Sequence, residues 1–215
     1  MKLDKKTLLL YGVTDRRWLA PGEQLSSAVE AALKGGITFL QLREKELDDE
    51  AVLEEARELK KLCQRYGVPF VVNDKVQLAL DVDADGVHVG QKDMKVEEAR
   101  SVLGSDKLIG VSVQTVEQAL QAQKEGADYL GVGSVFPTSS KGDAAAVSLE
   151  TLRDICSAAD LPVVAIGGIQ ADNAELLKDS GICGAAVISA VFGQPDIQFA
   201  AAELKRILWD KVVQP

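Results

Sequence analysis

Gln41, Arg43 and Lys45 occupy alternate positions in the sequence FLQLREK, which covers residues 39–45. Successive side chains of a β-strand point to opposite faces, so a strand here would place these three polar groups on one face and Leu40 and Leu42 on the other. Arg43 and Lys45 bring two positive charges to the polar face. The pattern predicts a hydrated cavity that attracts an anion, with the apolar face packed against helices.

Two carboxylates, Asp74 and Asp93, come after neighbouring apolar runs. Parallel strands lie about 4.8 Å apart, so carboxylates that follow adjacent strands can share a divalent cation. Mg²⁺ commonly takes one or two carboxylates and completes its shell with water and substrate phosphate. Alternatively, each Asp caps the helix or turn that follows it. With Arg43 and Lys45 nearby, the carboxylates suggest a magnesium-bound pyrophosphate.

Gly167 and Gly168 end another apolar run, and Ser189 ends the last one. Glycines let backbone N–H groups approach an anion closely, and phosphate sites after the seventh and eighth strands recur in (β/α)8 barrels. The alternative is a pair of glycines that packs at a crowded barrel end. The sequence favours a phosphate site.

The polar stretch 138–143 predicts a loop longer than its neighbours, and such loops often close over a site. Lys141 in this loop either contacts a phosphate or is a solvated surface residue. His88 is the only histidine and lies in an apolar run. A lone histidine in that setting is more often a hydrogen-bonded core residue than a general base, despite its convenient pKa.

Short apolar runs alternate with amphipathic segments along the whole chain, which predicts eight strand–helix units. The expected strands are 8–14, 38–45, 69–74, 86–90, 108–113, 129–136, 163–169 and 185–191. The expected helices are 23–34, 49–66, 76–81, 96–103, 116–125, 149–159, 172–179 and 197–212. Eight units in 215 residues predict one α/β domain over 1–215, a (β/α)8 TIM barrel with its site at the C-terminal strand ends. A doubly wound open sheet is the alternative, but no G-x-G-x-x-G follows the first strand.

The formal net charge of −9 argues against nucleic-acid partners, which need a basic surface, and disfavours anionic membranes. Cys63, Cys156 and Cys183 are widely spaced and odd in number, which predicts reduced thiols in a cytoplasmic protein. No run approaches the length that crosses a membrane. The expected partners are small molecules, and association into a homo-oligomer is left open.

Seven segments, in order, carry a resemblance to a known family: QLREK, VVNDK, GVHVGQKDM, IGVSV, VFPTSSKGD, VAIGGI and VISA. Together they resemble thiamine-phosphate synthases, over about residues 10–192. The resemblance implies an enzyme that joins 4-amino-2-methyl-5-hydroxymethylpyrimidine pyrophosphate to a thiazole phosphate and releases thiamine phosphate and pyrophosphate.

The resemblance also implies roles for individual residues. It places the pyrimidine pyrophosphate on Gln41, Leu42, Arg43, Glu44, Lys45 and Asn73, with Ser112 and Lys141 on the pyrophosphate. It assigns Mg²⁺ to Asp74 and Asp93. It places the thiazole phosphate on Thr138, Ser139, Ser140, Gly168, Ile188 and Ser189. It further implies that pyrophosphate departs first, helped by Arg43, Lys45, Lys141 and Ser112, and that the thiazole nitrogen captures the resulting cation.

Two rival functions remain open. One is a thiazole tautomerase-like paralogue, which would handle only the thiazole phosphate and would not need the basic cluster together with both carboxylates. The other is a non-catalytic barrel that binds a phosphate ligand, since a fold alone does not define a function.

Overall fold

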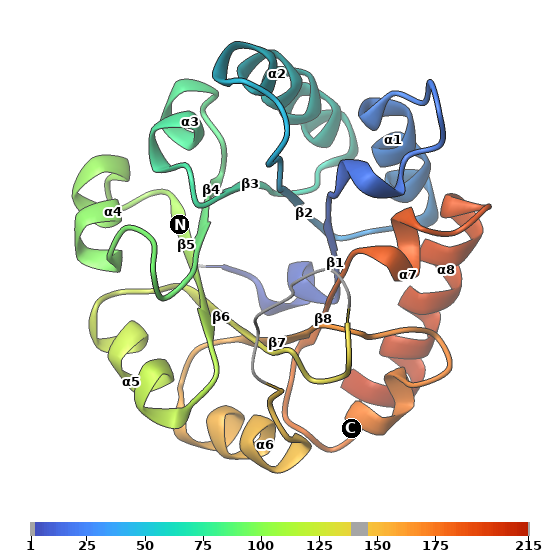
Figure 1. The fold of residues 1–215 in the computed structure, drawn as a ribbon. Helices are drawn as coiled ribbons and strands as arrows, with labels where there is room; N and C mark the ends of the chain where they lie inside the picture. The colour runs from blue at the N-terminus through green and yellow to red at the C-terminus, as the bar shows by residue number, and fades with distance from the viewer. Residues whose placement is uncertain (1–2, 139–145, 215) are drawn as a thin grey trace.

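The computed structural model describes residues 3–138 and 146–214. Eight parallel strands close into a barrel in sequence order, β1 pairing with both β2 and β8, as Figure 1 shows along the barrel axis. The strands are β1 Leu10–Val13, β2 Phe39–Leu42, β3 Phe70–Asn73, β4 Gly86–Val89, β5 Leu108–Val113, β6 Tyr129–Val132, β7 Val163–Ile166 and β8 Gly184–Val187. The predicted (β/α)8 barrel is confirmed.

Helices surround the strands (Figure 1). The α-helices are α1 Leu25–Gly35, α2 Asp49–Tyr66, α3 Val76–Asp81, α4 Val96–Leu103, α5 Val116–Lys124, α6 Leu149–Ala158, α7 Ser189–Phe192 and α8 Ile197–Ile207. Three 3-10 helices, η1 Lys5–Leu8, η2 Arg16–Trp18 and η3 Ala174–Leu177, and the wider π-helix η4 Leu208–Val213 complete the helical segments of the described residues. None of the helices in the described ranges is long and apolar enough to cross a membrane.

Helix α2 has the predicted bounds because its sequence carries both end signals. The Asp48 carboxylate accepts the Ala51 N–H at 2.9 Å and caps the start, while Gly67 ends the helix in the left-handed conformation with φ of 67°. Val52, Ala56 and other residues at helical spacing are buried against the barrel.

The seventh helix differs from its prediction. Residues 172–179 form only the 3-10 helix η3, because the Asn173 side chain accepts the Gln170 N–H and Asp179 takes a φ of 60°. These turns at both ends leave too few residues for a regular α-helix. The last strand ends earlier than expected, at Val187, and α7 then begins at Ser189.

Side chains alternate between two apolar cores. Leu40 and Leu42 belong to the outer core between strands and helices. Inside the barrel, Tyr11, Phe39 and Tyr129 form an aromatic cluster with centroid distances of 4.6, 5.6 and 6.0 Å. The barrel interior is therefore filled at this level.

Gly110 is required where Tyr129 and His88 occupy the barrel interior. A Cβ at this position would lie 2.1 Å from Cζ of Tyr129 and 2.5 Å from Nδ1 of His88. Gly110→Ala should therefore lower the free energy of unfolding by roughly 1–3 kcal/mol through overpacking, as measured by urea denaturation.

Gly12→Ala is the matched control, because the nearest atom to a Cβ there, Cδ1 of Ile37, lies 3.3 Å away. Its loss of stability should be clearly smaller. Equal losses for the two variants would contradict the packing assigned to Tyr129 and His88.

Candidate active site

A cavity of about 400 Å³ opens at the C-terminal ends of the barrel strands. Its lining combines charged, amide, hydroxyl and glycine residues with a few apolar ones. They are Arg43, Lys45, Asn73, Asp74, Gly90, Gln91, Lys92, Asp93, Ser112, Gln114, Gly131, Gly133, Ser134, Thr138, Ile166, Gly167, Gly168, Ile169, Ala186, Val187, Ile188 and Ser189. Most of the residues predicted from the sequence therefore meet at one site.

A hydrogen-bonded network lies beneath this cavity. The Gln41 side-chain amide donates to the Tyr11 hydroxyl at 2.5 Å, and that hydroxyl bonds Tyr129 at 2.9 Å. His88 continues the network, with Nδ1 at 3.2 Å from the Tyr129 hydroxyl and Nε2 at 2.9 Å from the Ser112 hydroxyl. His88 is thus a buried, hydrogen-bonded core residue, which the sequence favoured over a general base.

Burial raises the pKa values of Tyr11 and Tyr129 above the ordinary tyrosine range. Both phenols therefore stay neutral and act as hydrogen-bonding groups. Gln41 faces this network and therefore lies below the main cavity. With Tyr11 and His88 it lines a separate void of about 20 Å³. A void of this size has room for about one water molecule.

The Asp74 and Asp93 carboxyl groups lie within hydrogen-bonding reach of each other. Burial and the neighbouring Asp93 raise the pKa of Asp74 to about 6, while Lys45 acts in the opposite direction. Neither carboxylate caps a helix: α3 and α4 have Lys75 and Lys95 at their N-caps without a side-chain cap. Asp93 does close a turn, because its Oδ2 accepts the Gly90 N–H at 2.8 Å.

The structure shortens the strand predicted over 38–45. Strand β2 ends at Leu42, because Oγ1 of Thr14 accepts the Arg43 N–H at 2.9 Å where a sheet partner would be needed to continue. Arg43 and Lys45 therefore lie in the loop beyond the strand, yet both still line the cavity. Arg43 is paired with Asp15 at 3.0 Å.

The opposite side of the cavity is formed after β7 and β8. Gly167 and Gly168 have positive φ values of 98° and 65°, and a Cβ on Gly168 would lie 2.4 Å from the Pro137 carbonyl oxygen. Their backbone is therefore closely packed as well as exposed to the cavity. The Ser189 hydroxyl accepts a hydrogen bond from Gln170 at 3.1 Å, next to Ile188.

Besides Gln41, two further predicted residues lie away from this cavity. Leu42 is buried in the outer core, and Glu44 is turned toward Arg16, which donates to it at 2.9 Å. Their side chains serve packing and charge pairing. Ser139, Ser140 and Lys141 lie outside the described residues.

The sequence predicts no role for Asp15, Gln91, Lys92, Gln114 or Ser134. Four of them line the cavity, and Asp15 holds Arg43. Each follows a barrel strand, which is the same signal that identified Asp74 and Asp93.

The chain matches the family model described as thiamine monophosphate synthase over residues 10–191. The chain belongs to the thiamine monophosphate synthase family. A thiamine-phosphate synthase from Clostridium tetani is 47% identical over 195 residues, covering 91% of this chain and 93% of that protein. One from Desulfitobacterium hafniense strain Y51 is 49% identical over 201 residues, covering 93% and 96%.

A solved structure also supports membership of this family. Thiamine phosphate pyrophosphorylase from Pyrococcus furiosus superposes with a TM-score of 0.89 at 44% identity, covering 96% of this chain and 98% of that one. As a member of the thiamine monophosphate synthase family, the chain is a transferase of thiamine biosynthesis. The resemblance seen in the sequence is thereby confirmed at the level of family and enzyme class.

Asp74 and Asp93 repel each other when both are charged. We therefore expect the pair to lower the stability of the folded protein when no cation is bound. An unfolded Asp has a pKa near 3.9, so between about pH 4 and 6 folding takes up a proton at Asp74, and the free energy of unfolding falls as pH rises through this window. Asp74→Asn should therefore stabilise the protein by roughly 1–2 kcal/mol at pH 8 without divalent cations, and hardly at all near pH 4.

Urea denaturation at the two pH values measures this difference. Asn also tolerates the positive φ of 60° at this position, so backbone strain does not obscure the result. Asp49→Asn is the control, because the pKa of Asp49 is lowered by its hydrogen bond to Lys75. A stabilisation by Asp74→Asn that does not change with pH would contradict the repulsion between the two carboxylates.

Proposed function

We propose that this chain couples 4-amino-2-methyl-5-hydroxymethylpyrimidine pyrophosphate to a thiazole phosphate, giving thiamine phosphate and pyrophosphate in a Mg²⁺-dependent reaction. The observation that carries this proposal is the grouping of Arg43 and Lys45 with the Asp74–Asp93 pair on one cavity wall. Cations and paired carboxylates together suit a metal-bound pyrophosphate better than a simple phosphate. The relatives named as thiamine-phosphate synthases support the same reaction.

The residues present fit a magnesium ion. Asp74 and Asp93 would hold it, since two carboxylates leave positions for water and pyrophosphate oxygens, and the raised pKa of Asp74 is what a carboxylate pair shows without a cation between its members. Among the described residues, no third acidic, histidine or cysteine side chain joins the pair as a candidate ligand. When bound, the ion would neutralise charge that develops on the leaving pyrophosphate.

In the proposed reaction, the bond between the methylene carbon of the pyrimidine and the pyrophosphate oxygen breaks first. Its electron pair leaves with pyrophosphate, and the pyrimidine ring stabilises the cation. The thiazole nitrogen then donates its lone pair to the methylene carbon, so no proton is lost at the new bond. Arg43 and Lys45 would stabilise the leaving charge, as would Ser112 by a hydrogen bond.

The glycine wall would hold the second substrate. Gly168, Ile188 and Ser189 would place the thiazole phosphate opposite the pyrophosphate, with Thr138 at the same rim. Holding both substrates in one cavity raises their effective concentration at the reacting atoms. The roles of Ser139, Ser140 and Lys141, the cytoplasmic location and the absence of a nucleic-acid partner stay predictions.

The test is a coupling assay on purified protein with both substrates, in Mg²⁺ or in excess EDTA, with thiamine phosphate detected after oxidation to its fluorescent thiochrome. Product should form only with Mg²⁺. Asp93→Ala should lower turnover at least about 100-fold, because it removes one carboxylate from the proposed metal site. Its circular dichroism spectrum should stay unchanged.

Asp106→Ala is the control, because Asp106 is exposed and lies outside the cavity lining. It should keep wild-type turnover. Full activity of Asp93→Ala at low Mg²⁺ would overturn the metal assignment. A folded wild-type protein that makes no product, but isomerises a thiazole carboxylate phosphate, would favour the tautomerase-like alternative.

A further inference from the structure

Thr14, directly after β1, holds the backbone of Arg43, directly after β2, by hydrogen bonds. Thr14 is fully buried. Its hydroxyl group accepts a hydrogen bond from the Arg43 N–H at 2.9 Å and donates one to the Arg43 carbonyl oxygen at 3.3 Å. The Thr14 N–H also donates to the Gln41 carbonyl oxygen at 3.0 Å. Both backbone polar groups of Arg43, the N–H and the carbonyl oxygen, are therefore hydrogen-bonded to Thr14.

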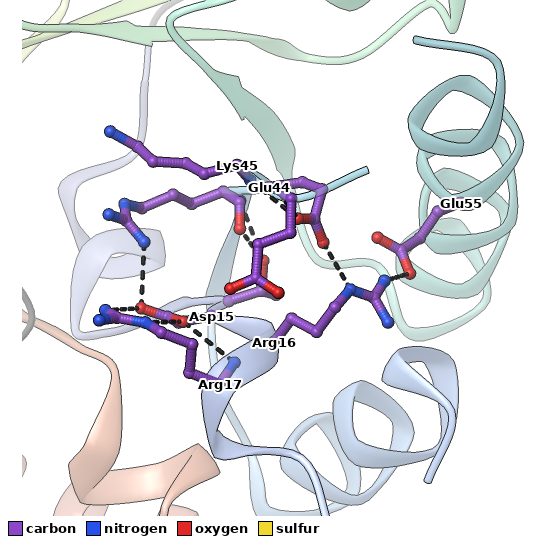
Figure 2. Close-up of polar contacts among 9 residues, drawn as sticks. Asp15, Arg16, Arg17, Glu44, Lys45 and Glu55 are labelled. Atoms are coloured by element: carbon purple, nitrogen blue, oxygen red, sulfur yellow. Dashed lines mark hydrogen bonds and ion pairs between the residues drawn. The ribbon is translucent and has the colours of Figure 1, made fainter. Parts of the chain in front are cut away.

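Asp15 fixes the other end of the same residue. Its Oδ2 accepts from Nη1 of Arg43 at 3.0 Å, and the carboxylate also takes a bidentate pair from Arg17, with Nε at 2.9 Å from Oδ1 and Nη2 at 2.6 Å from Oδ2 (Figure 2). The Asp15 side chain is 4% exposed and the Arg43 side chain 10%, whereas Arg17 is half exposed.

Burial acts to raise the pKa of Asp15, but the hydrogen bonds from Arg17 and the charge of Arg43 outweigh it, so the pKa lies below its ordinary value. Asp15 is thus charged at neutral pH. An ion pair this shielded from water holds its geometry more firmly than an exposed pair would.

This arrangement leaves part of the Arg43 guanidinium facing the cavity. Among the described residues, Nη1 is the one guanidinium nitrogen of Arg43 with a hydrogen-bond partner. Arg43 lines both the main cavity and the small void beneath it. The remaining N–H groups are therefore held at the edge of the cavity, on the wall that carries Lys45 and Asp74.

We infer that Asp15 is a positioning residue for the pyrophosphate end of the reaction, acting through Arg43. The inference rests on the proposed function for the identity of the ligand. Asp15 does not line the cavity itself. It orients the guanidinium that binds the leaving group, while Arg17 balances the charge of the carboxylate from the solvent side.

The direction in which Asp15→Asn changes pyrophosphate binding distinguishes the orienting of Arg43 from the electrostatic effect of the Asp15 charge alone. Asp15 brings a negative charge close to an anion site, so if it acted only through its field, Asp15→Asn would tighten pyrophosphate binding. If it orients Arg43, the same substitution weakens binding. Asp15→Glu keeps the charge and moves the carboxylate by one methylene, so a field effect predicts no change and positioning again predicts weaker binding.

The experiment is calorimetric titration of inorganic pyrophosphate with Mg²⁺ into the full-length wild-type protein and its variants. Asp15→Asn and Asp15→Glu should each raise the dissociation constant about tenfold, the scale of one charge-assisted hydrogen bond. Arg17→Gln, the matched control at the other partner of Asp15, should stay within about twofold. In an Arg43→Gln background, Asp15→Asn should lose most of its effect.

Turnover adds a second measurement. Asp15→Glu should lower kcat/KM for the pyrimidine pyrophosphate and leave the KM of the thiazole phosphate unchanged, which a general loss of folding would not do. Equal or tighter pyrophosphate binding by both Asp15 variants would overturn the inference. Weakened binding by these variants, together with no coupling by the wild type, would uphold Asp15 as an anchor of Arg43 and overturn the proposed reaction alone.

Discussion

The aromatic cluster inside the barrel is the constraint on which the site depends. Tyr11, Phe39 and Tyr129 fill the interior, and the two hydroxyl groups meet Gln41 and His88 at its upper surface. Burying phenols without partners would cost free energy, so the cluster needs polar groups directly above it. Apolar packing below and hydrogen bonding above thus set the depth of the cavity, and the residues at the strand ends form its walls.

Several charged groups beside the cavity form ion pairs, in a chain that carries a net charge of −9. Arg43 is balanced by Asp15, and Arg16 lies between Glu44 and Glu55, whose carboxylates it contacts on opposite sides (Figure 2). Oε2 of Glu55 is the one fully buried side-chain polar atom in the described residues without a hydrogen bond, and burial raises the pKa of this carboxyl group. The ion pair of Arg16 and Glu44 lies on the outer side of the loop after β2, and Lys45 in the same loop lines the cavity.

The barrel and most of the site could be predicted because both follow from short-range pattern. Alternation in FLQLREK correctly placed Leu40 and Leu42 in the outer core and Gln41 in the interior. The end of β2 could not be predicted, since it depends on Thr14, which lies far away in the sequence. The role of Asp15 was missed for the same reason: its partner Arg43 is 28 residues away, and only closure of the barrel brings the two together. Local turns likewise reduced the expected helix at 172–179 to η3.

The order of strands around the barrel also bears on how two anionic substrates could bind together. The charged wall comes from the ends of β2, β3 and β4, and the glycine and hydroxyl wall from the ends of β7 and β8, so the two lie on different sides of the ring. Repulsion between two anions falls with distance and with the charge of intervening cations. In the proposed reaction, Arg43 and Lys45 on one wall would leave the other wall to bind phosphate through backbone N–H groups and a hydroxyl. In the proposed reaction, positive charge would then be concentrated at the leaving group, where negative charge develops in the transition state.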